Sequence, residues 1–242
     1  MHEARTAVVT GASSGVGRAT AMALAEVGLD VALVARRRES LEQTAQHIAG
    51  QGGRAVSVVA DLRDPRAAER AMEEARTALG PVDALINCLG TNIPNRGLAD
   101  MTPEDWNTVI ATNLSAVYYC VRALLPSMRE RGAGMIVSIS SLAALQASTL
   151  SGSAYSASKA GLNMLSACIN LEDGPNGVRS CVICPGDINT GLLDKRPEPP
   201  NPERRRHMLQ PRDVADLVVA VLRQPEHAWV DEVVVRPRAV IN

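Results

Sequence analysis

A tyrosine and a lysine four residues apart, Tyr155 and Lys159, stand in the short run YSASK. On a helix this spacing places both side chains on one face, one turn apart. A free tyrosine has a pKa of about 10, and a neighbouring ammonium group favours the phenolate and lowers that pKa. The pair is therefore suited to pass a proton to or from a substrate oxygen. The same spacing occurs by chance in many helices, so its meaning depends on what else the chain supplies.

A glycine-rich turn, TGASSGVG at 10–17, could hold a dinucleotide. It follows a run typical of a strand and opens a run typical of a helix. Glycines allow a tight turn and a close approach of the backbone to a pyrophosphate, and a helix N-terminus offers unpaired N–H groups. Such a turn can be purely structural, but its place in a strand–turn–helix unit favours cofactor binding. The residues expected at the cofactor are Gly11, Ser13, Ser14, Gly15, Val16 and Gly17.

Three arginines, Arg36 to Arg38, follow the second predicted strand. Enzymes that use NAD usually carry Asp or Glu here, where the carboxylate binds the ribose 2′-hydroxyl. An acidic residue would repel the 2′-phosphate of NADP, whereas a guanidinium matches phosphate geometry. The sequence therefore predicts NADP(H), with Arg36 as the main phosphate ligand and Arg37 as the second. At least one of the three is expected to face solvent.

Two further strand ends carry residues expected at the cofactor. Asp61, followed by Leu62, ends the third strand, where a carboxylate can accept a hydrogen bond from the adenine amino group or cap a turn. Asn87 and Gly90 lie in NCLG after the fourth strand, where the chain must pass close to the cofactor.

Two polar positions could complete a proton-transfer site. Ser141 follows the fifth strand, where its hydroxyl would polarise a substrate carbonyl, and the neighbouring Ser140 is the alternative. Asn113 lies in the middle of a long predicted helix, where asparagine is unfavourable. Either the helix is distorted there, with a bound water linking Asn113 to Lys159, or Asn113 occupies an ordinary surface position.

The elements that must position these residues alternate along the chain. Short, nearly continuous apolar runs predict parallel strands, covered on both faces, at 6–10, 30–35, 55–60, 84–87, 135–139, 179–184 and 232–236. Helical patterns occur at 17–27, 40–49, 65–79, 103–131, 153–172 and 211–223, with Asp64 and Thr102 as expected N-caps. The alternation predicts an α/β fold, a doubly wound Rossmann-type sheet of seven parallel strands with helices on both faces, in a single domain over 1–242.

One stretch, RPEPPNPERRR at 196–206, breaks the alternation. Its prolines and its basic run argue against a packed strand and against the interior of a regular helix. It is either a solvated surface loop or part of a segment, 191–210, that covers the substrate beyond the sixth strand.

Composition narrows the function. Hydrophobic residues make up 46% and charged residues 21% of the chain, as in globular proteins. The net charge of -1 and the 2% of aromatic residues argue against nucleic acid and membrane partners. No apolar run is expected to span a membrane, and the first strand begins too early for a signal peptide.

Five cysteines in mainly apolar runs predict reduced core residues of a cytoplasmic protein. Cys181 and Cys184 should point to opposite faces of a strand, so no metal site is expected.

In this order the motifs resemble the short-chain dehydrogenase/reductase family, in its single-domain form, from Thr6 to about Thr190. One departure is NCLG, where the family has NNAG. The family's catalytic tetrad implies Asn113, Ser141, Tyr155 and Lys159, the last two also touching the cofactor. Its segment for the nicotinamide carboxamide corresponds to PGDINT and implies Pro185, Gly186, Ile188 and Thr190.

The resemblance implies an NADP(H)-dependent oxidoreductase that transfers hydride between the nicotinamide and a ketone or secondary alcohol. One alternative is a reductase of 3-oxoacyl groups on a carrier protein, for which 204–206 would supply a basic surface. Another is a non-catalytic NADP-binding regulator, which would not need Tyr155 and Lys159 together. Members of the family often form homo-oligomers, as tetramers or dimers, through the helices at 103–131 and 153–172.

Overall fold

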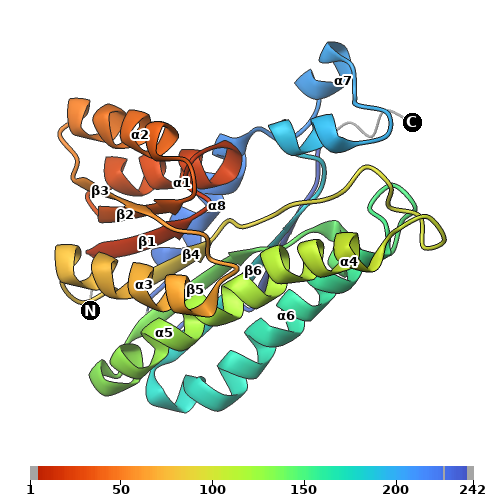
Figure 1. The fold of residues 1–242 in the computed structure, drawn as a ribbon. Helices are drawn as coiled ribbons and strands as arrows, with labels where there is room; N and C mark the ends of the chain where they lie inside the picture. The colour runs from red at the N-terminus through yellow and green to blue at the C-terminus, as the bar shows by residue number, and fades with distance from the viewer. Residues whose placement is uncertain (1–4, 226, 239–242) are drawn as a thin grey trace.

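Seven parallel strands form one sheet in the computed structural model, which describes residues 5–225 and 227–238 (Figure 1). The strand order is β3-β2-β1-β4-β5-β6-β7. Because β1 lies between β2 and β4, the chain winds outward in both directions from this point, where a ligand crevice is expected. The predicted fold class is confirmed; the predicted domain ends at 1 and 242 lie outside the described residues. The strands are β1 (Thr6–Thr10), β2 (Asp30–Ala35), β3 (Ala55–Val59), β4 (Ala84–Asn87), β5 (Gly134–Ile139), β6 (Val178–Pro185) and β7 (Glu232–Val235).

Helices cover both faces of the sheet (Figure 1). On one face lie α1 (Gly15–Glu26), α2 (Arg38–Gly50) and α8 (Pro211–Leu222), and on the other lie α3 (Pro65–Leu79), α5 (Ala116–Arg131) and α6 (Ser153–Asp173). Successive strand side chains point to opposite faces, so the apolar residues of β1 and β2 contribute alternately to two apolar cores. Val9 and Leu33 pack in the first core, and Val8 and Ala32 in the second.

The two predicted N-caps, Asp64 and Thr102, are present in the structure. The Asp64 carboxylate accepts hydrogen bonds from the first-turn N–H groups of α3, and Thr102 Oγ1 accepts one from the Asp105 N–H at 3.1 Å. Both predictions are confirmed, and each cap satisfies N–H groups that a helix leaves unpaired.

The long helix predicted over 103–131 has three parts. It begins as α4 (Pro103–Ile110), passes through a π-helical turn, η1 (Ala111–Ser115), and continues as α5. Asn113 lies inside the π-helical turn and is 0% exposed. The helix is therefore distorted at Asn113, and an ordinary surface position is wrong for this residue.

The same stretch, Pro103–Arg131, is the one helix of the described residues that is long and apolar enough to reach across a membrane by length and composition. The expectation that no apolar run reaches this length is therefore wrong. Val109, Leu124 and Met128 of this stretch are buried in the apolar cores. A helix that helps to build a core passes the same test, so the finding is weak as a sign of membrane insertion.

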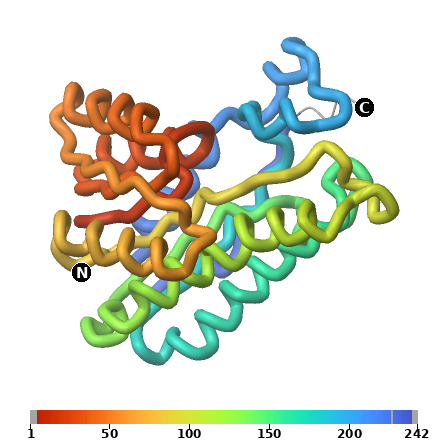
Figure 2. Tube along the Cα trace, viewed as in Figure 1, coloured from red at the N-terminus to blue at the C-terminus, as the bar shows by residue number. Residues whose placement is uncertain are grey.

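The proline-rich segment contains a helix that the sequence did not predict. A 3-10 turn, η4 (Gly191–Lys195), is followed by the single-turn helix α7 (Pro202–Arg206). Pro202 stands in the first turn, where no backbone donor is needed, and Asn201 caps the turn by accepting from the Arg204 N–H at 2.8 Å. In Figure 2 this segment extends beyond the sheet at the end where the chain around 90–100 also lies.

The cysteines are only partly as expected. All five are free thiols, and Cys120, Cys181 and Cys184 are buried, but Cys168 is exposed on α6. Its helix also exposes Met164 and Leu171. A core position is therefore wrong for Cys168. The exposed apolar side chains leave the predicted oligomer contact on α6 open as a prediction.

Candidate active site

A cavity of about 1300 Å³ opens at the carboxyl ends of the strands. It exceeds the usual size of a site for one small ligand, so it has room for a dinucleotide and a substrate. All the predicted site residues line it except Asn87 and Asn113. The Asn87 side chain points to β5, where it donates to Ser138 Oγ at 3.3 Å.

The three glycines of the turn stand at positions where a side chain would be strained or would clash. Gly11 and Gly15 have φ values of +68° and +54°, which disfavour other residues. A Cβ on Gly17 would lie 2.4 Å from the Gly11 carbonyl oxygen. Ser14, the N-cap of α1, makes no side-chain capping bond. The start of α1 therefore keeps backbone donors for an anion, which fits the pyrophosphate of a dinucleotide.

The segment after β6 lies against the glycine turn. A Cβ on Gly15 would be 3.3 Å from Thr190 Cγ2. Pro185, Gly186 and Ile188 line the cavity beside Thr190. Two motifs separated by most of the chain thus meet across one cavity, as a cofactor-binding role for both requires.

The three arginines after β2 differ in whether they line the cavity. Arg36 and Arg37 line the cavity, whereas Arg38 does not and lies 3.7 Å from Glu42. All three are exposed, and Arg38, which lies outside the cavity, meets the expectation of a residue that faces only solvent. Asp61 also lines the cavity, and Arg63 binds its carboxylate at 2.5 Å. The pKa of Asp61 is lowered, chiefly by the hydrogen bond from Arg63.

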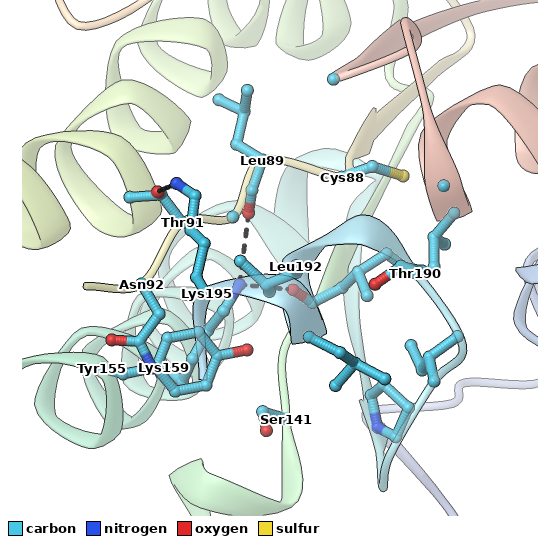
Figure 3. A pocket seen from close by; sticks show the side chains of 18 of the residues that line it. Cys88, Leu89, Thr91, Asn92, Ser141, Tyr155, Lys159, Thr190, Leu192 and Lys195 are labelled. Carbon is cyan, nitrogen blue, oxygen red and sulfur yellow. Dashed lines mark hydrogen bonds between the residues drawn. The ribbon is translucent and has the colours of Figure 1, made fainter. Parts of the chain in front are cut away.

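Helix α6 carries Tyr155 and Lys159 to the other end of the cavity (Figure 3). Lys159 is only 2% exposed, and its Nζ donates to the Ile139 carbonyl at 2.8 Å and the Leu89 carbonyl at 3.3 Å. Burial lowers its pKa to about 8. The Nζ lies 5.9 Å from the centre of the Tyr155 ring.

The pKa of Tyr155 is raised, mainly by burial. The Ser141 hydroxyl and the charges of Arg196 and Arg96 act in the opposite direction but do not reverse it. The expectation of a lowered pKa is therefore wrong. The reason is that desolvation of the phenol outweighs its neighbours, and the cations acting on it are the two arginines.

The two candidate serines have different surroundings. Ser141 Oγ accepts from the Ala143 N–H at 3.1 Å, and its hydroxyl acts to lower the pKa of Tyr155, which lies in the same half of the pocket in Figure 3. Ser140 is buried, and its hydroxyl binds the Asn163 side chain behind the cavity. This arrangement favours Ser141 as the residue that meets a substrate.

Asn113 lies behind the cavity wall. Its Oδ1 accepts from the Thr91 N–H at 2.8 Å, and its Nδ2 donates to the Thr91 carbonyl at 3.0 Å and to Ser158 Oγ at 3.0 Å. It therefore fixes the loop after β4 to the helix that carries Tyr155. A water link from Asn113 to Lys159 stays a prediction.

Sequence reasoning missed several cavity residues because they lie in loops without a motif. Arg96 is buried between loops, Arg196 pairs with Asp187, and Lys195 Nζ donates to Thr91 Oγ1 at 2.9 Å (Figure 3). No local pattern marks an arginine that becomes buried only when distant loops meet. Among residues 5–225 and 227–238 no group of three His, Cys, Asp or Glu side chains could hold a metal ion.

Two curated relatives are oxidoreductases of different lengths. The chain is 34% identical over 243 residues to the glycine betaine reductase of Emericella nidulans, covering 97% of this chain but 19% of that protein. It is 31% identical over 233 residues to an uncharacterized oxidoreductase of Staphylococcus aureus, with 96% and 97% of the two chains covered.

Among the solved structures of similar chains, some contain NADP and some contain NAD. A metagenomic short-chain oxidoreductase in complex with NADP is 34% identical, with a TM-score of 0.84 and 97% of each chain covered. A 3-oxoacyl-[acyl-carrier protein] reductase from Brucella melitensis with bound NAD is 26% identical, with a TM-score of 0.87, covering 100% of this chain and 93% of that chain. The short chain dehydrogenase family model matches residues 5–201. With this match and the site described above, the chain belongs to the short-chain dehydrogenase family and is an oxidoreductase.

Proposed function

We propose that the protein is an NADP(H)-dependent oxidoreductase that interconverts a ketone and a secondary alcohol. One observation carries the proposal: Tyr155, Ser141 and Lys159 line the same cavity as the glycine turn and Arg36. A cofactor held by the turn would reach toward the acid/base group. This continuity supports redox chemistry on a bound substrate over cofactor binding alone.

NADP(H) fits the residues at the adenosine end. Strand β2 ends at Ala35 without a carboxylate, and Arg36 and Arg37 line the cavity directly after it. Guanidinium groups suit a 2′-phosphate. The NADP complex of the metagenomic relative supports this choice, while the NAD complex of the Brucella relative makes cofactor preference a point to measure. When bound, the reduced cofactor supplies a hydride.

The proton would come from Tyr155. Because its pKa is raised, the phenol is protonated at neutral pH and is a donor for a carbonyl oxygen. The Ser141 hydroxyl would hydrogen-bond the same oxygen and so polarise the carbonyl. Lys159, held by two backbone carbonyls, has a third N–H available for a cofactor ribose hydroxyl.

The carrier-protein alternative is weaker because the basic run is already engaged. Arg204 lies 3.9 Å from Asp187, and Arg205 pairs with Asp194. Only Arg206 is left without such a partner among the described residues. The 3-oxoacyl-carrier reductases among the structural relatives nevertheless make this substrate worth including in the test.

A substrate screen tests the proposal. Purified protein is incubated with NADPH or NADH and a panel of neutral ketones, oxo acids and one 3-oxoacyl thioester on a carrier protein, and cofactor absorbance is followed. We expect oxidation of NADPH with at least one free carbonyl compound and slower oxidation of NADH. Cofactor binding without turnover of any carbonyl or alcohol would contradict the proposal and favour a regulator.

A further inference from the structure

Arg96 is a buried cation held by three separate segments. It is 8% exposed, and it donates from Nε to the Ile93 carbonyl at 2.9 Å, from Nη1 to the Leu150 carbonyl at 2.7 Å and from Nη2 to the Lys195 carbonyl at 2.8 Å. The backbone is shaped around it: a Cβ on Gly152 would lie 2.6 Å from Arg96 Cβ. The fold thus places this guanidinium firmly at the junction of the loops that enclose the cavity.

The charge of Arg96 has no carboxylate partner in the described part of the chain. The ion pairs among the described residues each join another arginine to Asp or Glu, and none includes Arg96. Carbonyl oxygens satisfy three of the five guanidinium N–H groups but do not cancel the positive charge. Buried charges are normally paired, because an unpaired one is costly. Arg96 therefore lacks the anion that its position calls for.

A second arginine lies beside the same cavity. The Arg196 side chain is 11% exposed and pairs with Asp187, which Arg204 also approaches. Arg196 and Arg204 thus share the Asp187 carboxylate while Arg96 has none, and all four residues line the cavity. The charges of Arg196 and Arg96 act to lower the pKa of Tyr155, and that of Asp187 acts to raise it. The excess positive charge is located beside the acid/base group.

The cavity wall also carries apolar side chains, among them Leu142, Leu150, Leu192 and Leu193. An apolar body would contact these side chains, and an anionic head would supply the partner that Arg96 lacks, with Arg196, already bound to Asp187, beside it. A carboxylate accepts forked hydrogen bonds from guanidinium groups, which an uncharged ketone or an ester cannot match in strength.

We propose that the substrate is an oxo acid, or the hydroxy acid formed from it, whose carboxylate is bound by Arg96 and Arg196 while its carbonyl lies between Tyr155 and Ser141. This inference rests on the proposed function. In the reductive direction the carbonyl carbon accepts a hydride from the reduced cofactor and the oxygen accepts the Tyr155 proton. The C=O double bond becomes a C–O single bond, and the carboxylate passes through unchanged.

The test compares each acid with its own methyl ester. The probes are 3-oxobutanoate and methyl 3-oxobutanoate, and 2-oxobutanoate and methyl 2-oxobutanoate, which also distinguish the two spacings of carboxylate and carbonyl. For the spacing that fits, we expect the wild-type kcat/KM for the acid to exceed that for the ester by about tenfold or more. Arg196→Gln should lower this acid-to-ester ratio by about tenfold, because a charged partner is lost.

Arg96→Lys provides a second variant, since it keeps the charge but loses the planar fork, and it should also lower the ratio. Arg212→Gln is the matched control, because Arg212 pairs with Glu26 and Asp216 on the surface of α1 and α8 and should leave the ratio unchanged. The ratio cancels any effect that loss of a cation has on the pKa of Tyr155, since acid and ester use the same phenol. A melting temperature for each variant identifies loss of fold.

Two results would overturn the inference. One is wild-type turnover of both esters as fast as of their acids. The other is an Arg196→Gln variant that folds and loses acid and ester activity equally. In either case turnover of neutral ketones would leave the proposed function standing. No turnover of any carbonyl compound would contradict the proposed function as well.

Discussion

The side-chain amide of Asn113 pairs with both backbone polar groups of Thr91, accepting from its N–H at 2.8 Å and donating to its carbonyl at 3.0 Å. The two hydrogen bonds have the pattern of one residue pair in a β-sheet, with the side-chain amide in place of a peptide group. This pairing explains why the helix opens into a π-helical turn there: the local distortion accompanies an asparagine whose amide faces the loop after β4. The loop that carries Gly90 and Thr91 is fixed by this contact.

Asn113→Ala should therefore destabilise the fold. It removes the partner of both Thr91 backbone groups, which are partly buried, and is expected to lower the free energy of unfolding by about 1–3 kcal/mol. Urea unfolding measures this loss. Asn107→Ala on the exposed side of α4 is the matched control and should change stability by less than about 0.5 kcal/mol. Equal effects of the two substitutions would contradict the structural role given to Asn113.

Cofactor preference should depend on Arg36 and Arg37 but not on Arg38. Arg36→Gln should raise the Kd for NADPH by about tenfold, because one charge-assisted contact to phosphate is lost, and should leave the Kd for NADH within about threefold. Arg37→Gln should have a smaller effect in the same direction. Arg38→Gln is the control, since Arg38 lies outside the cavity near Glu42. Fluorescence titration with each cofactor gives these values, and an unchanged NADPH affinity in Arg36→Gln would remove its assigned role.

The glycine turn gives a steric prediction. Gly17→Ala would place a Cβ 2.4 Å from the Gly11 carbonyl oxygen, so the turn must shift and the start of α1 must move. We expect NADPH affinity to fall by about tenfold or more. Gly50→Ala is a suitable control, because a Cβ there meets nothing within 4 Å and alanine favours the helix. Wild-type NADPH binding by Gly17→Ala would show that the close packing of the turn is unnecessary.

Burial of Lys159 predicts a dependence of stability on pH. Its pKa falls from 10.5 in its ordinary state to about 8 on folding, so between these values the unfolded chain binds more protons than the folded one. Stability therefore rises as pH rises through this window, and the cost of burying the ammonium is fully present below pH 8. Lys159→Met removes that cost at every pH.

The difference between the two proteins is the quantity to measure. From pH 7.5 to 9.5 the wild type should gain about 2 kcal/mol of unfolding free energy relative to Lys159→Met, by urea unfolding in the presence of a reducing agent. Groups that titrate in both proteins, such as the cysteines, cancel in this comparison. A difference that stays constant across this range would mean that the pKa of Lys159 is not lowered.

Local chemistry made much of this molecule predictable. The apolar runs of β1 and β2 can only be covered on both faces, so they reveal a parallel sheet, and Asp64 and Thr102 cap helices through contacts two or three residues away. The glycine turn and YSASK were recognisable because their functions need particular residue types at fixed short spacings.

What the sequence did not reveal depends on distant segments. The pKa of Tyr155 is raised by burial, while the Ser141 hydroxyl and the charges of Arg196 and Arg96 act to lower it. The two arginines come from loops whose meeting no periodicity predicts. Arg96 is bound by carbonyls from residues 3, 54 and 99 positions away. The sequence indicated a distortion at Asn113 only because asparagine is unfavourable inside a helix. The partner of its amide, Thr91, lies in another loop, and no sequence pattern places the two side by side.

The most direct test of the account is the activity of Tyr155→Phe with saturating NADPH and a carbonyl substrate identified in the screen. This substitution removes the phenol oxygen and keeps the ring. We expect kcat to fall by about a thousandfold, since the proton donor is lost, while the Kd for NADPH stays within about threefold of the wild type. A Tyr155→Phe variant that retains wild-type kcat would contradict the assignment of Tyr155 as the acid and with it the proposed reaction.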